Sequence, residues 1–175
     1  MNLKPLFLVI LSLLLVGFTI PEKLEKKVDK VISNYFESEV FSKELLTIDA
    51  SIAEELPAEF AENLFAVKNE NALMGYVYIG NAPSKTATFD YLILFDKDFI
   101  VMKSKVLIYR EEYGGEIGSK RWLKQFIGTS SASETLIPTQ NISAISGATI
   151  SVRSMTNAVN DVLKSIGILQ ERKAI

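Results

Sequence analysis

The stretch Ser146-Gly147-Ala148-Thr149 stands immediately before an amphipathic helical pattern near the end of the chain. Apolar residues then recur at helical spacing, at Met155, Val159, Val162, Leu163 and Ile166. Gly167 is expected to end this helix. Small residues before a hydroxyl at a helix start suit a phosphate, because the backbone can approach closely and the first N–H groups lack partners. The simpler interpretation is that Thr149 or Ser151 only caps the helix.

The middle of the chain has the pattern of antiparallel strands. Aromatic and β-branched residues dominate four runs that turn-forming residues separate, at 64–67, 73–80, 86–95 and 99–110. The last two runs flank Asp96-Lys97-Asp98 and predict a hairpin. We therefore expect an α+β fold, in which a small antiparallel sheet has flanking helices.

Three further segments have helical patterns, at residues 22–38, 52–63 and 120–126, and a short strand is expected near 45–48. In the first segment the charges are of mixed sign, which favours a solvated face over a basic patch. The third carries Trp122 and Phe126 one helical turn apart, as in an ordinary core pair.

Composition excludes several classes of function. The net charge of −2 gives no indication of the basic surface that nucleic-acid-binding proteins use. The chain has no histidine and no cysteine, which removes the usual zinc, iron–sulfur and thiol chemistry and the Ser-His-Asp triad. No metal site and no catalytic side chain is expected, so redox work would need a borrowed cofactor.

Residues 6–20 form one apolar run that follows Lys4 and ends at Pro21. The run fits a secretory signal peptide, and it also approaches the roughly 20 residues of an uncleaved membrane anchor. Residues 1–20 are therefore expected to be a signal peptide or an anchor. In either case Lys4 favours an extracytoplasmic location for the rest of the chain, on the periplasmic or cell-surface side.

The Ser-Gly-Ala-Thr stretch before a helix resembles the flavinylation motif of the FMN-binding domain family. That family includes the C subunit of the sodium-pumping NADH:quinone oxidoreductase and the G subunit of the Rnf complex. The resemblance implies that a flavin transferase esterifies Thr149 to the phosphate of FMN, with Ser146, Gly147 and Ala148 completing the motif. Ser151 matches a further hydroxyl position, whereas the family usually has Asp where this chain has Ser143.

Two other segments share this resemblance. Glu111 and Gly114 match the family's Glu-Thr-Pro-Gly loop, and Trp122 precedes a Gln-Phe pair and a glycine as it does there. The resemblance implies that these residues form part of the flavin pocket. Without it, the loop is a plain surface turn. Arg153 and Lys120 could pair with flavin or phosphate charge, or only keep the surface soluble.

These observations predict a helical N-terminal region at 22–63 and an FMN-binding domain at 64–175. The implied function is an extracytoplasmic electron carrier with covalent FMN, which relays electrons between a membrane-bound redox partner and an acceptor. It would be a carrier or a subunit of an oxidoreductase, not a self-contained enzyme. The alternatives are a membrane-tethered interaction domain without flavin and, last, a flavin-dependent reductase of a small substrate.

Overall fold

The computed structural model describes residues 21–175, so the predicted signal or anchor at 1–20 lies outside the described residues. Its elements run in the order α1 (Glu22–Phe36), β1 (Ser42–Leu45), α2 (Ala50–Ala53), β2 (Leu64–Asn69), β3 (Ala72–Pro83), β4 (Thr88–Phe95), β5 (Val101–Tyr109), η2 (Gly115–Gly118), α3 (Lys120–Leu123), η3 (Lys124–Phe126) and α4 (Thr149–Glu171). The predicted α+β fold is confirmed. Among the helices of residues 21–175, none is both long enough and apolar enough to cross a membrane.

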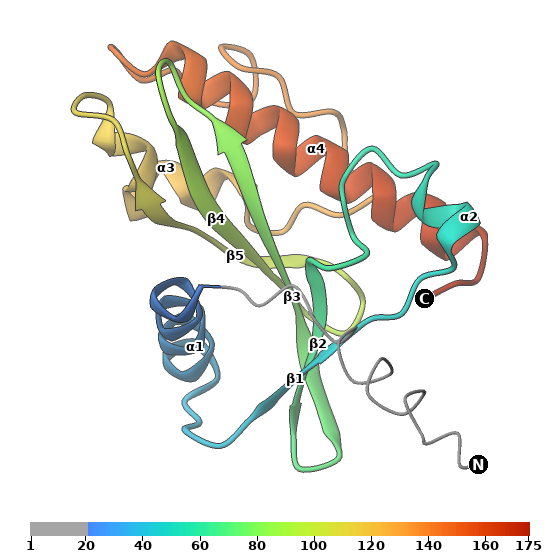
Figure 1. Ribbon diagram of the computed structural model, residues 1–175. Helices are drawn as coiled ribbons and strands as arrows, with labels where there is room; N and C mark the ends of the chain where they lie inside the picture. The colour runs from blue at the N-terminus through green and yellow to red at the C-terminus, as the bar shows by residue number, and fades with distance from the viewer. Residues whose placement is uncertain (1–20) are drawn as a thin grey trace, which may run out of the picture.

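The five strands form one sheet in the order β1-β2-β3-β4-β5, and every neighbouring pair is antiparallel. The long helix α4 lies across one face of this sheet and α1 lies on the other (Figure 1). Strand β4 is buried on both faces, because Tyr91, Ile93 and Phe95 join the core on the α4 side while Leu92 and Leu94 join the core on the α1 side. The continuous apolar run of β4 is the sequence signature of this two-sided burial.

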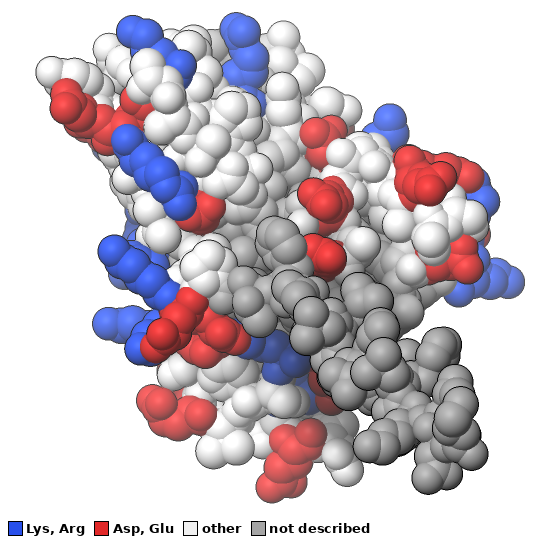
Figure 2. All heavy atoms as spheres, viewed as in Figure 1, with Lys and Arg blue, Asp and Glu red and all other residues white. Residues whose placement is uncertain are grey.

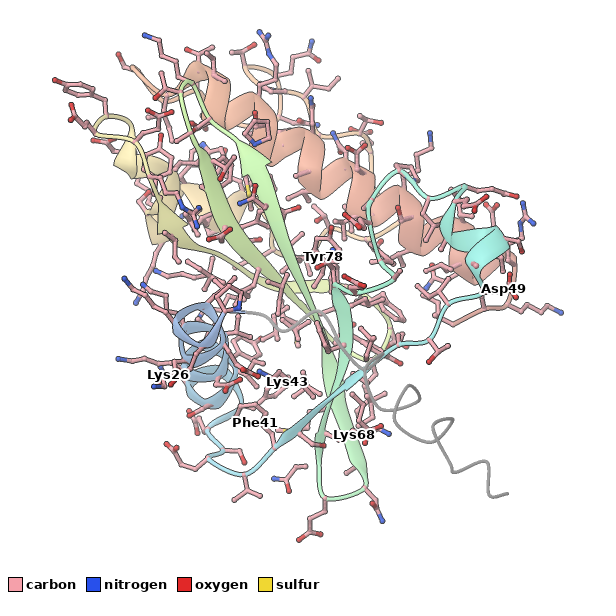
Figure 3. All side chains as sticks on the ribbon, in the orientation of Figure 1. Lys26, Phe41, Lys43, Asp49, Lys68 and Tyr78 are labelled. Carbon is pink, nitrogen blue, oxygen red and sulfur yellow. The ribbon has the colours of Figure 1, made fainter. Side chains whose placement is uncertain are left out.

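Helix α1 packs on the sheet through Val28 and Ile32, which are fully buried. Its outer face carries charges of both signs, as the sequence pattern predicts. Figure 3 shows Lys43 of β1 close to α1, and its ammonium group forms ion pairs with Glu25 and Asp29 of that helix. These pairs tie α1 to the edge strand β1.

Helix α4 contributes seven buried residues to the core on its face of the sheet, and it begins at Thr149, the last residue of the stretch that the sequence placed before the helix. The prediction that Gly167 ends this helix is wrong, because α4 continues to Glu171. A Cβ at position 167 would lie 3.3 Å from the Cβ of Ser131. The glycine therefore allows the loop around Ser131 to approach the helix closely.

The predicted helix at 52–63 is also wrong. The only helical turn there is α2, where the side chain of Asp49 accepts a hydrogen bond from the backbone N–H of Ser51. Pro57 disfavours a longer helix, and the following chain instead inserts Phe60 into the core and donates the Ala58 N–H to Ser165 of α4. The short strand β1 likewise lies at Ser42–Leu45, ahead of the predicted 45–48.

Candidate functional site

The start of α4 is not closed by a side-chain cap. Ala148 occupies the cap position without a side-chain hydrogen bond, so neither Thr149 nor Ser151 caps the helix. Thr149 is the first helical residue and is exposed. The first intrahelical bond runs from the Val152 N–H to the Ala148 carbonyl. The N–H groups of the turn before Val152 thus have no partner within the helix, and they favour an anion there.

The loop after β5 lies directly against this motif. An added Cβ at Gly114 would come within 2.7 Å of the Cβ of Ala148, and Gly114 has φ +79°. Gly147 also has a left-handed backbone, with φ +78°. Both glycines are therefore required by the local backbone, and Gly114 is required by the close approach as well. The structure brings together two segments that are far apart in the sequence.

Tyr109, the last residue of β5, connects the same two segments. Its hydroxyl donates a hydrogen bond to the Tyr113 carbonyl at 3.0 Å and lies 3.1 Å from the hydroxyl of Ser151. Because the tyrosine proton is already used, Ser151 is the donor in the second bond. Ser151 is buried, so its hydroxyl holds the helix start in place and is not free at the surface.

Glu111 faces a different neighbour. Its carboxylate accepts hydrogen bonds from the Ser84 hydroxyl, from the Thr86 hydroxyl and N–H, and from the Ala87 N–H, at 2.6 to 3.1 Å. These bonds lower the pKa of Glu111 from its ordinary 4.5 to about 2, the Thr86 N–H contributing most. Glu111 thus fastens the turn between β3 and β4 to the loop that carries Gly114.

Trp122 anchors the segment that leads into the motif. Its indole N–H donates to the Ser143 carbonyl at 2.7 Å, and the Gln125 side chain accepts from the Ser143 N–H at 2.8 Å. The Trp122 ring is buried, with its edge packed against Phe126. Both backbone groups of Ser143 are therefore fixed, whatever side chain this position carries.

A pocket of about 340 Å³ adjoins Thr149. Arg153 and Asn157 line it from successive turns of α4, and Thr139 and Ile145 line it from the preceding loop. Arg153 lies one helical turn after Thr149 and adds a positive charge on the same side of the helix. Lys120 is not part of this pocket, since it lines a separate groove described below.

The predicted site residues therefore fall into three groups. Ser146, Gly147, Ala148, Thr149 and Ser151 form the helix start, and Gly114 packs against it. Trp122 acts on it through Ser143, whereas Glu111 bonds to the turn at 84–87. Sequence reasoning missed the linking role of Tyr109 and the part that Gln125 plays. The position of Tyr109 at a strand end gives no signal of this, but Gln125 follows Trp122 at i+3 on a predicted helix.

Comparison with known families finds one match that includes this site. Residues 86–164 match the FMN-binding domain family. The match contains every predicted site residue, from Glu111 to Ser151, so the family's domain coincides with the cluster described above. Among curated proteins, none matches the chain.

Among solved structures, the chain is similar to the crystal structure of NqrC from Shewanella oneidensis. The two share 18% sequence identity with a TM-score of 0.51, over 78% of this chain and 70% of that chain. At this level of identity the likeness shows a common fold. It extends the agreement beyond the FMN-binding domain match, into elements that precede residue 86.

Proposed function

We propose that this chain carries FMN covalently on Thr149 and serves as an electron carrier outside the cytoplasm. The observation that supports this most directly is the exposed Thr149 at an uncapped helix start, inside a match to the FMN-binding domain family. The phosphoester would form through the Thr149 hydroxyl oxygen, which loses its proton, while a flavin transferase supplies FMN from a donor with a leaving group.

The residues present suit such a phosphate. The free N–H groups of the first turn of α4 and its dipole favour a negative charge, and Arg153 adds a cation at the adjoining pocket. Gly114 and Gly147 keep the backbone free of side-chain atoms around Ala148. When bound, FMN supplies one-electron and two-electron transfer. The chain's own residues hold the group, orient it and set the charge around it.

Attachment also fits the proposed location. Reversible occupancy depends on the free FMN concentration, whereas a covalent bond does not. A carrier outside the cytoplasm would otherwise lose its flavin to a dilute medium. The proposed partners are the flavin transferase and a membrane-bound reductase, with the N-terminal segment at 1–20 supplying the membrane contact or the export signal.

Ser143, where the family usually has Asp, favours the alternative of an interaction domain without flavin. The structure weakens this argument for the alternative, because Trp122 and Gln125 hold Ser143 through its backbone groups alone. The segment before the motif is thus anchored without a carboxylate at this position.

The decisive experiment is intact-mass analysis of the full chain after co-expression with a flavin transferase specific for threonine. We expect a mass increase of one FMN phosphoester and fluorescence that remains on the denatured chain. Thr149→Val should abolish both, whereas Thr135→Val, which removes another exposed hydroxyl, should leave both unchanged. An unmodified wild-type mass with an active transferase would refute the proposal and favour the interaction domain.

A further inference from the structure

A second hollow, of about 770 Å³, lies between α1, β5 and α3. We call it the lysine groove, because six lysines line it and no acidic residue does; they are Lys27, Lys30, Lys103, Lys105, Lys120 and Lys124. Figure 2 shows basic side chains, with acidic ones between them, along the left edge of the molecule; the residues that line the groove itself are basic, polar or apolar. Three separate elements thus bring one sign of charge to one place.

No acidic side chain among residues 21–175 pairs with these six lysines, although Lys27 donates a hydrogen bond to the Leu107 carbonyl at 3.1 Å. The lysines that form ion pairs within residues 21–175 are Lys26, Lys43 and Lys68, none of which lines the groove. The chain as a whole is slightly acidic, with 21 acidic residues against 19 basic ones. The unbalanced positive charge of the groove is therefore a local arrangement and does not reflect the overall composition.

Lys103, in β5, is in unfavourable surroundings at the groove. Burial, followed by the charges of Lys120 and Lys105, lowers the pKa of Lys103. Like charges that repel one another in one hollow are stabilised when an anion binds among them.

We propose that the lysine groove binds a small anion that carries two or more phosphate groups. Lysine ammonium groups bind phosphate as point charges, and several around one hollow match a ligand with several negative groups. Its volume is typical of small-molecule sites. Tyr35 on the rim, exposed by 38% and 5.6 Å from the Lys103 ammonium to its ring centre, offers a face for a ring or chain attached to the phosphates.

The residue types favour this ligand over an acidic protein. Protein interfaces are enriched in arginine and depleted in lysine, and this groove contains no arginine. The phosphates could belong to a soluble molecule or to a phospholipid headgroup, since both present the same chemistry. The inference does not depend on flavin attachment, because no groove residue belongs to the site around Thr149.

The test is calorimetric titration of the full chain with inorganic tripolyphosphate, in parallel with flotation on two kinds of vesicle. One kind is pure phosphatidylcholine, and the other contains about one-fifth cardiolipin, whose headgroup carries two phosphates. The groove variant is Lys103→Gln with Lys120→Gln. The control, Lys85→Gln with Lys97→Gln, removes the same charge from exposed positions outside the groove. Every titration is repeated in Thr149→Val protein, which separates this site from flavin loading.

We expect tripolyphosphate binding that weakens with salt, falls about tenfold or more in the groove variant, and stays near the wild-type level in the control. Vesicle binding that needs cardiolipin and the groove lysines would assign the phosphates to a lipid, and tripolyphosphate binding without vesicle binding would assign them to a soluble ligand. The proposal is overturned if neither probe binds at low salt, or if the groove and control variants lose binding equally. It is also overturned if the groove binds polyglutamate, an acidic polymer without phosphate, but not tripolyphosphate or vesicles.

Discussion

The start of α4 and the lysine groove lie on two sides of the same short segment, α3 with η3, and they are built in opposite ways. Around the start of α4 the side chains of Tyr109, Ser151, Trp122 and Gln125 form hydrogen bonds, and the first N–H groups of the helix are left open. In the groove, cations gather without counter-charges. The hydrogen bonds of the first region fix the backbone that leads into α4. The second region carries positive charge that a bound anion would balance.

The largest expected effect is at the first region. Gly114→Ala should destabilise the fold by about 1–3 kcal/mol, because alanine is strained at positive φ and its Cβ would collide with Ala148. Urea unfolding measures this, and flavin incorporation should fall with it. Gly115→Ala is the matched control, since a Cβ there meets nothing within 4 Å. Equal stability of the two variants would show that the loop does not pack on the motif.

Glu111→Gln should give the next effect, and one that depends on pH. An amide cannot accept all four hydrogen bonds, so the urea midpoint should drop at neutral pH. The depressed pKa of Glu111 means that its stabilisation is present above about pH 4.5 and is lost as pH falls toward 2. The difference between wild type and variant should therefore shrink across that window. Glu112→Gln, next to it in the sequence, should show no such convergence.

Tyr109→Phe removes the hydroxyl that links Tyr113 with Ser151. The loss should be about 1 kcal/mol in the free energy of unfolding, because a buried serine loses its partner. Tyr113→Phe is the control, since that ring is 79% exposed and only its backbone carbonyl takes part. If both substitutions cost the same, the bridge contributes nothing to stability.

The smallest effect, with the opposite sign, is expected in the groove. Lys103→Gln should stabilise the unliganded chain by a few tenths of a kcal/mol at low salt, because it relieves repulsion with Lys120 and Lys105. The gain should vanish at high salt. Lys97→Gln, at an exposed turn, should not show this salt dependence. A loss of stability in Lys103→Gln would contradict the repulsion.

The first region could largely be predicted from the sequence, because its residues are contiguous. A motif of small residues, a hydroxyl and a helical pattern are all local signals, and they placed the beginning of α4 correctly. The hairpin of β4 and β5 was equally visible, since alternating runs flank a turn. The conformation of the segment at 52–63 was not predicted correctly. Its apolar residues pack against the core from a loop around Pro57, so their spacing does not reflect a helix.

The lysine groove could not be predicted in this way. In the sequence, lysines 27 and 30 stand among acidic neighbours, and the pattern was interpreted as a mixed, solvated face. The fold sorts these charges, since Glu22, Glu25 and Asp29 pair with Lys26 and Lys43 while Lys27 and Lys30 turn toward β5. Only packing between distant segments then adds the lysines of β5 and α3.

The short segment between the two regions has one further consequence. Trp122 and Gln125 hold Ser143 from one side of it, and Lys120 and Lys124 reach into the groove from the other. Any anion that binds those lysines also acts on the turn that holds Ser143 ahead of the start of α4. Should that turn shift, anion binding in the groove and reversible phosphate binding at the start of α4 would change each other's affinity by the same factor, in both directions.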